Sequence, residues 1–297
     1  MVSPGILLVD KPAGLTSHDV VARTRRAFGT RKVGHAGTLD PMATGLLVIG
    51  IEGATRLLTY IVGADKTYEA TIRLGSTTDT DDADGEVLTR APSEAWGSIT
   101  DERIADGIRS LSGTISQVPS SVSAIKVDGR RAYDRVRAGE EVVLAAREVT
   151  VSRFEVLARR EGEGVLDLDV VVDCSSGTYI RSLARDLGAD LGVGGHLTAL
   201  RRTRVGDFDV ADAVGIDDLG GARTLTPAQA ASRVLQALEV SADDARDLRH
   251  GKRLAGQAAR LDGSLAAAID DDGVLVGVVE KRGADLKSAM NMPEVRG

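Results

Sequence analysis

The segment GHAGTLDPMATG, at positions 34–45, combines residue types that could hold one carboxylate in place for chemistry. It sets three glycines, two threonines and a proline around Asp40, between apolar stretches of the chain. Glycine permits backbone conformations that other residues avoid, and proline fixes φ, so such a loop can keep Asp40 at a set position. Taken alone, Asp-Pro in a glycine-rich loop is more typical of a structural turn.

Three other residues have types suited to a site. Tyr68 starts a predicted strand, where most tyrosines are half-buried structural residues. Tyr179 and Arg181 stand at the start of a predicted helix, where a cation opposes the helix dipole. A buried carboxylate is therefore the natural partner of Arg181. An exposed arginine whose stem lies on the surface is the alternative.

Two further residues, Lys11 and His35, lie where predicted strands meet loops. Lys11 in such a place is typical of a capped turn, and a histidine there is more often structural than an acid or base. Neither residue carries a function on local grounds alone.

Charge gives an ambiguous signal about nucleic acid. The net charge is −7 and the pI about 5.3, which argues against an RNA or DNA partner. Binding depends on a local basic face, however, rather than on the total. The basic residues do cluster in three places: Arg23, Arg25, Arg26, Arg31 and Lys32; Lys126, Arg130 and Arg131; Arg201, Arg202 and Arg204.

Composition favours a soluble cytoplasmic protein without a zinc site. A single cysteine, Cys174, excludes an intrachain disulfide framework. The four histidines are scattered, without zinc-ligand spacing. The apolar run at the N-terminus is too short for a signal peptide, and no run approaches the ~20 apolar residues of a membrane span.

Hydrophobic patterns predict a mixed α+β fold with many strands. We expect strands at 5–10, 46–51, 67–75 and 197–208, and an antiparallel pair at 149–160 and 165–176. We expect helices at 17–28, capped by Ser17, at 101–111, and at 178–192 with Ile180, Leu183, Leu187 and Leu191 facing the core. Loops are expected at 33–45 and at the acidic segment 77–86, which reads as solvated.

The last part of the chain reads as a small β-rich module. Residues 220–230 resemble a linker. A short helix is expected within 241–254, ended by Gly251. A hairpin is expected around Asp271, Asp272 and Gly273.

Six segments, taken together and in order, resemble the TruB family of tRNA pseudouridine-55 synthases. They are LLVDKPAGLTS, RKVGHAGTLDPMATGLLVIGI, KTYEATIRLG, QVPSSVSAIKVDGRRAY, CSSGTYIRSLARDLG and LTALRRTRVG, between about residue 5 and about residue 208. GxLDPxATG is that family's catalytic signature. The resemblance implies a mostly antiparallel catalytic domain at 1–225, an RNA-contacting insertion at 112–147, and a PUA-like RNA-binding module at 235–297.

The resemblance also implies a cofactor-free isomerisation. Uridine 55 in the T-loop of tRNA loses its N1–C1′ bond, rotates, and is rejoined through C5. Asp40 matches the family's essential aspartate. Three roles are open to it: attack on the ribose, addition to C6 of uracil, or elimination to a glycal. Because a base within an RNA loop is inaccessible, base flipping is expected.

Further residues take their roles from the same resemblance. Arg181 matches the arginine that pairs with this aspartate, and Tyr68 the tyrosine on which the flipped base stacks. Tyr179 and Leu200 match pocket walls, His35 the residue that takes the place of the flipped base, and Lys11 a support of the catalytic loop. The expected RNA contacts are Lys126, Arg130, Arg131 and Arg202.

Three alternatives remain open. The chain could be an RNA chaperone whose chemistry is secondary or lost, a related synthase that modifies ribosomal RNA with protein and guide-RNA partners, or a metabolic enzyme without an RNA substrate. The intact Asp40, Tyr68 and Arg181 oppose loss of chemistry, and the lack of long basic tails favours a stand-alone enzyme. We therefore expect a monomer that acts on the T-stem-loop of tRNA, without a membrane or a required protein partner.

Overall fold

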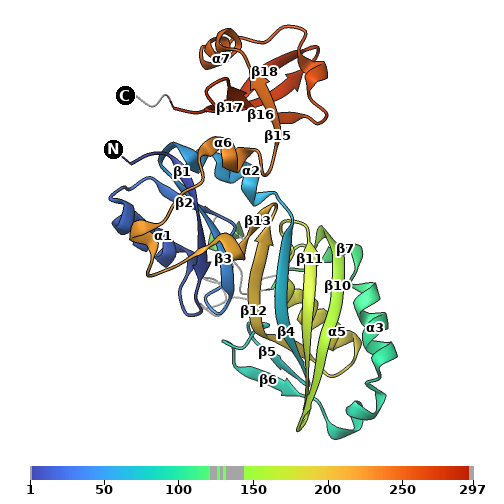
Figure 1. Cartoon of the computed structure of the whole chain (residues 1–297). Helices are drawn as coiled ribbons and strands as arrows, with labels where there is room; N and C mark the ends of the chain where they lie inside the picture. Colours follow the sequence, from blue (N-terminus) through green and yellow to red (C-terminus); the bar gives the residue numbers. More distant parts are fainter. Residues whose placement is uncertain (1, 121–125, 128–129, 132–143, 294–297) are drawn as a thin grey trace. The chain divides into compact units, whose positions relative to one another are not determined.

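The computed structural model describes residues 2–120, 126–127, 130–131 and 144–293 (Figure 1). Backbone contacts divide the chain into two compact units. The first unit combines residues 1–64 with 204–297, and the second contains residues 65–203. Because the first unit is made from both ends of the chain, its core depends on segments that are far apart in the sequence.

The sheet of the first unit is built around β1 (Gly5–Lys11), a strand of mostly buried residues. It pairs antiparallel with β3 (Thr44–Ile51) along its whole length and parallel with β14 (Val214–Gly215). β2 (Val33–Ala36) adds to β3 in antiparallel register. The predicted strands are confirmed here, but the loop predicted at 33–45 is shorter, because its first four residues pair with β3.

Helix α1 (Ser17–Phe28) has the predicted bounds but a different cap. The N-cap is Thr16, not Ser17, and the prediction was wrong here. Thr16 and Asp19 form a capping box, with the Asp19 amide donating to Thr16 Oγ1 at 3.1 Å and the Thr16 amide to Asp19 Oδ2 at 2.8 Å. The Ser17 hydroxyl is therefore available for another contact.

The C-terminal strands form a separate four-stranded sheet within the first unit. Its order is β15 (Gln236–Val240), β16 (Leu265–Asp270), β17 (Leu275–Arg282) and β18 (Asp285–Asn291). The predicted β16–β17 hairpin is confirmed. Helix α7 (Ala242–Arg249) is shorter than predicted, and Gly251 follows it with φ 76° and donates its amide to Leu248 O.

Two apolar clusters hold the first unit together. One lies within the C-terminal module and includes Leu238, Leu248 and Leu286. The other joins Ala267, Leu275 and Val278 of that module to residues of β1, β3, η1 (Glu52–Leu57) and α2 (Leu58–Val62). The segment read as a linker contains α6 (Pro227–Ala231), whose alanines enter this shared cluster. The division into 1–225 and 235–297 stays a prediction.

The second unit is a mostly antiparallel sheet with helices packed against it. Its strand order is β12 (Gly195–Val205), β4 (Lys66–Leu74), β11 (Val165–Cys174), β10 (Arg147–Gly162) and β7 (Gly113–Gln117). The predicted antiparallel pair is confirmed as β10 and β11. Helix α3 (Asp101–Ser110) contacts α5 (Ile180–Asp190) and β10, and all four predicted core residues of the α5 segment are buried.

Together the two units confirm the predicted fold class, a mixed α+β protein with mostly antiparallel sheets. A short hairpin of β5 (Ser76–Thr78) and β6 (Val87–Arg90) completes the second unit and carries the acidic segment in its turn.

Candidate active site

The loop that carries Asp40 is held by hydrogen bonds on both sides of that residue. Before it, the amide of Leu39 donates to Ser17 Oγ at 2.9 Å, and the same hydroxyl donates to Leu39 O at 3.2 Å. After it, Pro41 O accepts from the amide of Gly14 at 2.8 Å. The backbone of half-buried Asp40 is thus fixed by α1 on one side and by the turn after β1 on the other.

Lys11 strengthens the second of these attachments. Its side chain is fully buried, and Nζ donates to the carbonyls of Pro12 at 2.9 Å, Leu15 at 2.7 Å and Pro41 at 3.2 Å. An ammonium group satisfies several buried carbonyls at once because it has three donors. This contact joins the turn after β1 to the residue that follows Asp40; a role of Lys11 in catalysis stays a prediction.

His35 lies on β2, just before the loop. Its ring meets that of His18, on α1, edge to face with 5.5 Å between centroids. The arrangement positions His35 beside the first turn of α1, where Ser17 also lies. The predicted replacement of a flipped base by His35 stays a prediction.

Tyr68 and Leu200, the predicted base-stacking and wall residues, lie in the second unit. Tyr68 is on β4 and Leu200 on β12, the strand next to it, and each is 8% exposed. Tyr179 is the N-cap of α5. The amide side chain of Gln117 brackets the backbone of Tyr179, accepting from its N–H at 2.8 Å and donating to its carbonyl at 3.1 Å. Gln117 begins one of the six segments that carry the family resemblance, but no role was predicted for it.

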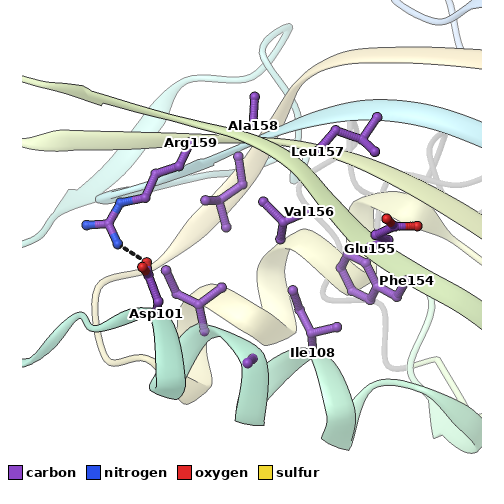
Figure 2. A pocket seen from close by; sticks show the side chains of 11 residues that line it. Asp101, Ile108, Phe154, Glu155, Val156, Leu157, Ala158 and Arg159 are labelled. Atoms are coloured by element: carbon purple, nitrogen blue, oxygen red, sulfur yellow. Dashed lines mark hydrogen bonds and ion pairs between the residues drawn. The ribbon is translucent and has the colours of Figure 1, made fainter.

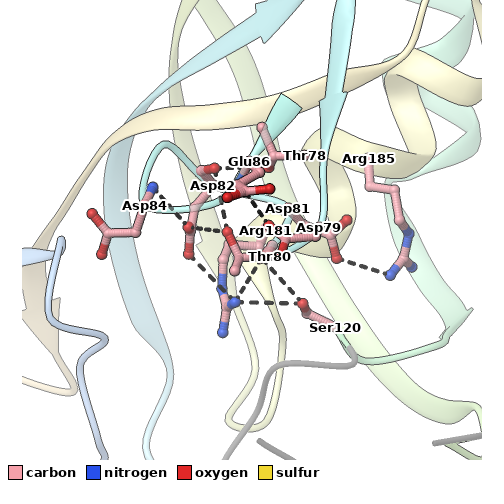
Figure 3. A network of polar contacts seen from close by, with 10 residues as sticks. All are labelled: Thr78, Asp79, Thr80, Asp81, Asp82, Asp84, Glu86, Ser120, Arg181 and Arg185. Atoms are coloured by element: carbon pink, nitrogen blue, oxygen red, sulfur yellow. Dashed lines mark hydrogen bonds and ion pairs between the residues drawn. The ribbon is translucent and has the colours of Figure 1, made fainter. Parts of the chain in front are cut away.

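Arg181 lies in the first turn of α5 and is buried against an acidic loop, as Figure 3 shows. Its Nη1 is 3.4 Å from Asp82 Oδ2, and the two side chains are 4% and 5% exposed. The same nitrogen donates to Thr80 O at 2.8 Å and to Ser120 Oγ at 3.4 Å. The expectation that a buried carboxylate accompanies Arg181 is confirmed for Asp82.

Asp82 corrects the interpretation of residues 77–86 as a solvated loop. Its carboxylate accepts from Thr80 Oγ1 at 2.5 Å and from the amide of Asp84 at 3.1 Å, and its carbonyl accepts from Thr78 Oγ1 at 2.7 Å. Alternating threonines and aspartates make such local bonds readily. The run of acidic residues concealed this signal, because most charge runs are solvated faces.

The acidic loop has a second attachment to α5. Arg185 Nη1 lies 3.3 Å from Asp81 Oδ2, and its Nη2 donates to Val118 O at 2.8 Å. Asp81 adopts a left-handed φ of 60°, unusual for a residue other than glycine. Burial raises the pKa of Asp81, and a hydrogen bond with Ser120 and the charges of the two arginines oppose that effect. Both arginines of α5 therefore fix the same loop.

Lys66 and Arg202 are buried cations of the second unit. Burial, followed by the positive charge of Arg202, lowers the pKa of Lys66 to about 8. Lys66 stands opposite Cys174 in the β4–β11 register, and burial raises the pKa of that thiol to about 11. Cys174 is thus protonated at neutral pH and a poor nucleophile. Arg202 is 1% exposed, which places it in the interior; its predicted RNA contact stays a prediction.

Two other predictions stay predictions. The first is the pairing of Arg181 with Asp40, because the two residues belong to different units. Lys126, Arg130 and Arg131 belong to the short pair β8 (Lys126–Val127) and β9 (Arg130–Arg131), whose side chains lie outside the described residues.

The cavity in Figure 2 lies elsewhere in the second unit. It measures about 520 Å³ and lies between α3 and β10, with Ile104, Ile108 and Phe154 on its walls. An ion pair between Arg159 and Asp101 borders it. Its lining includes none of the predicted site residues, and its mostly apolar character suggests packing rather than chemistry.

Within the described ranges, no group of three metal-ligand side chains is placed to hold a metal ion. Among the same residues, no helix is both long and apolar enough to cross a membrane. The cofactor-free chemistry expected from the sequence stays a prediction.

The anchoring of the Asp40 loop predicts a stability effect at Ser17. Ser17→Ala would leave both backbone groups of buried Leu39 without the hydroxyl, lowering the free energy of unfolding by about 1–3 kcal/mol. Urea denaturation measures the loss. Ser98→Ala, which removes an exposed hydroxyl bonded to Ala95 O, is the control and should cost less than about 0.5 kcal/mol. Equal losses in the two variants would contradict the anchoring.

The buried contact of Arg181 with Asp82 predicts a larger effect. Asp82→Ala removes a carboxylate from a desolvated guanidinium and should lower the free energy of unfolding by about 3–5 kcal/mol. The double variant Asp82→Ala/Arg181→Met should recover part of that loss. Asp106→Ala breaks the exposed pair with Arg109 and should cost under about 1 kcal/mol. Urea denaturation measures both losses. Similar denaturation midpoints for Asp82→Ala and Asp106→Ala would show that the buried pair is unimportant for stability.

Comparisons with known proteins agree along the whole chain. The family described as TruB family pseudouridylate synthase (N terminal domain) matches residues 25–180. The tRNA pseudouridylate synthase B C-terminal domain matches residues 181–242, and the tRNA pseudouridine synthase II C-terminal family residues 235–293.

Relatives and solved structures indicate the same family. The tRNA pseudouridine synthase B of Leifsonia xyli subsp. xyli is 60% identical, covering 99% of this chain and 98% of that protein. That of Corynebacterium diphtheriae is 50% identical, covering 96% and 95%. A crystal structure of a Cbf5-Nop10-Gar1 complex includes a chain 26% identical, with a TM-score of 0.72 and coverage of 98% and 84%. The chain therefore belongs to the TruB family, the tRNA pseudouridine synthases B, and is an isomerase that makes pseudouridine in tRNA.

Proposed function

We propose that this chain converts uridine 55 in the T-loop of tRNA to pseudouridine, with Asp40 as the catalytic carboxylate. The observation that carries the proposal is the anchoring of the Asp40 loop through both Leu39 and Pro41. Fixed backbone on both sides of a half-buried carboxylate is the preorganisation that stabilises charge in a transition state. The relative at 60% identity is named a tRNA pseudouridine synthase B, and the match covers 98% of its length. Both facts support a tRNA substrate.

The chemistry demands a carboxylate close to the ribose. Breaking the N1–C1′ bond leaves positive charge on the sugar, as in glycoside cleavage, and a carboxylate can stabilise that charge or capture it. C5 then bonds to C1′, C5 loses its proton and N1 gains one, so the product is an isomer of uridine. Attack on the ribose and elimination to a glycal place Asp40 beside the sugar, whereas addition to C6 places it beside the base of the same nucleotide.

Arg181 and Tyr68 would complete the site. Arg181 would pair with Asp40 and keep it ionised and oriented. Its guanidinium forms an ion pair with the buried Asp82 and donates a hydrogen bond to Thr80 O, and these contacts limit its movement. Tyr68 would provide the surface on which the flipped base stacks and could relay a proton.

The remaining residues would form the pocket and hold the RNA. Tyr179 and Leu200 would act as walls, His35 would take the place of the flipped base, and Lys11 would support the loop. Lys126, Arg130, Arg131 and Arg202 would contact the RNA. The two hydrogen bonds between the Gln117 side chain and the Tyr179 backbone fix that backbone, which supports a role of Tyr179 as a pocket wall.

We further propose a cytoplasmic monomer that needs no protein partner. The similar chain in the Cbf5-Nop10-Gar1 complex is part of an assembly. The whole-length relative at 60% identity is a tRNA pseudouridine synthase B, and this favours a tRNA substrate over a guide-dependent one.

Mapping of the product tests substrate and position together. Purified protein incubated with an unmodified tRNA transcript should form pseudouridine at position 55 alone, without added proteins or cofactors. The matched control is the same transcript with cytidine at position 55, which should gain no pseudouridine. Modification at other uridines, or activity that requires an added protein, would contradict the proposal.

A further inference from the structure

One stretch of the chain has a charge balance opposite to that of the whole protein. Acidic residues outnumber basic ones 44 to 37 overall. Residues 20–51 nevertheless contain five basic residues and a single acidic one, Asp40. Four of the five cations, Arg25, Arg26, Arg31 and Lys32, gather at the end of α1 and in the turn before β2. We call these four residues the α1 basic end.

The arginines of the α1 basic end are exposed, and their side chains do not cap the helix. The carbonyls of Arg25 and Arg26 are satisfied by the backbone, since they accept from the amides of Gly29 and Thr30. Arg25 donates to Val33 O at 3.2 Å. In the described part of the chain, no carboxylate forms an ion pair with Arg25, Arg26 or Arg31. These charges complement the helix dipole, but a dipole effect does not require cations beyond the last turn.

The turn that carries Arg31 and Lys32 is held by one acidic residue, Glu52. The Glu52 amide donates to Lys32 O at 2.7 Å, and its carboxylate accepts from the Thr30 hydroxyl and lies 3.5 Å from Lys32 Nζ. Glu52 itself adopts a left-handed φ of 53°. A residue held in that region usually reflects a requirement of the surrounding structure. The basic turn is therefore preorganised rather than a loose surface loop.

The α1 basic end lies in the same unit as Asp40, at a defined distance along α1. Ser17, at the start of the helix, contacts Leu39 next to Asp40. Arg25 and Arg26 lie eight and nine residues further on, about 12–14 Å along the helix axis. Because every nucleotide carries a phosphate, an RNA whose target nucleotide is at Asp40 would have backbone phosphates within this range.

We propose that the α1 basic end binds backbone phosphates of the tRNA stem adjoining the target loop. The proposal rests on the proposed tRNA substrate and adds a docking surface to it. Exposed arginines that form no ion pair with a described carboxylate suit phosphate oxygens, which they contact without reading sequence. Contacts of this kind position the RNA and strengthen its binding, while the chemical step depends on the residues around Asp40.

The experiment compares Arg26→Gln/Arg31→Gln with wild type, using a fluorescently labelled unmodified tRNA. The dissociation constant at about 150 mM salt should rise by roughly tenfold. The slope of log Kd against log salt should fall in magnitude by about 1.5–2, because two phosphate contacts are lost. The turnover number at saturating tRNA should stay unchanged. Arg26→Lys/Arg31→Lys keeps both charges and should retain most of the affinity.

The control is Arg103→Gln/Arg109→Gln on α3, which removes the same charge from an exposed helix that also carries Asp101, Glu102 and Asp106. This variant should bind within twofold of wild type. Equal weakening in both double variants would mean that total charge matters rather than this surface, and unchanged affinity in Arg26→Gln/Arg31→Gln would also overturn the proposal. If wild type binds tRNA but makes no pseudouridine, the proposed function fails while the binding comparison still stands.

Discussion

The hydrogen bonds that fix Leu39 and Pro41 are the constraint on which the placement of Asp40 depends. Pro41 restricts the backbone of Asp40 locally, but Gly37 and Gly45 leave the rest of the loop flexible. Instead, α1 holds one side through Ser17, and β1 with its following turn holds the other through Lys11 and Gly14. A buried lysine that satisfies three carbonyls replaces the rigidity that a glycine-rich loop lacks.

The second unit applies the same principle to a cation. Arg181 at a helix N-terminus is unfavourable by itself, and Asp82 offsets that cost from a hairpin turn distant in sequence. The threonines of that turn in turn fix Asp82. Buried polar contacts thus fix the surroundings of a candidate catalytic residue in each unit: the backbone on both sides of Asp40 in the first, and the guanidinium of Arg181 in the second. Such supporting contacts decide whether a site is positioned well enough to act.

Hydrophobic periodicity predicted much of this fold, and local chemistry predicted less of the site. The β10–β11 pair and the core face of α5 follow from patterns that burial imposes directly. The strand β2 was missed because Gly34 and His35 look like loop residues, and only pairing with β3 makes them a strand. The Thr16 cap could have been found from Asp19 three residues later. Asp82 and Gln117 act on partners far away in sequence, and nothing in their immediate neighbours indicates those partners.

The central claim is that the negative charge of Asp40, held by this scaffold, is the agent of catalysis. Asp40→Asn keeps the shape and most of the hydrogen-bonding capacity of the side chain but removes its charge and its nucleophilicity. The decisive measurement follows tRNA binding and pseudouridine formation by this variant in parallel with wild type. The account predicts tRNA affinity close to that of wild type and no detectable pseudouridine. Substantial isomerisation by Asp40→Asn would contradict it, and Asp40 would then be a turn residue in a well-anchored loop.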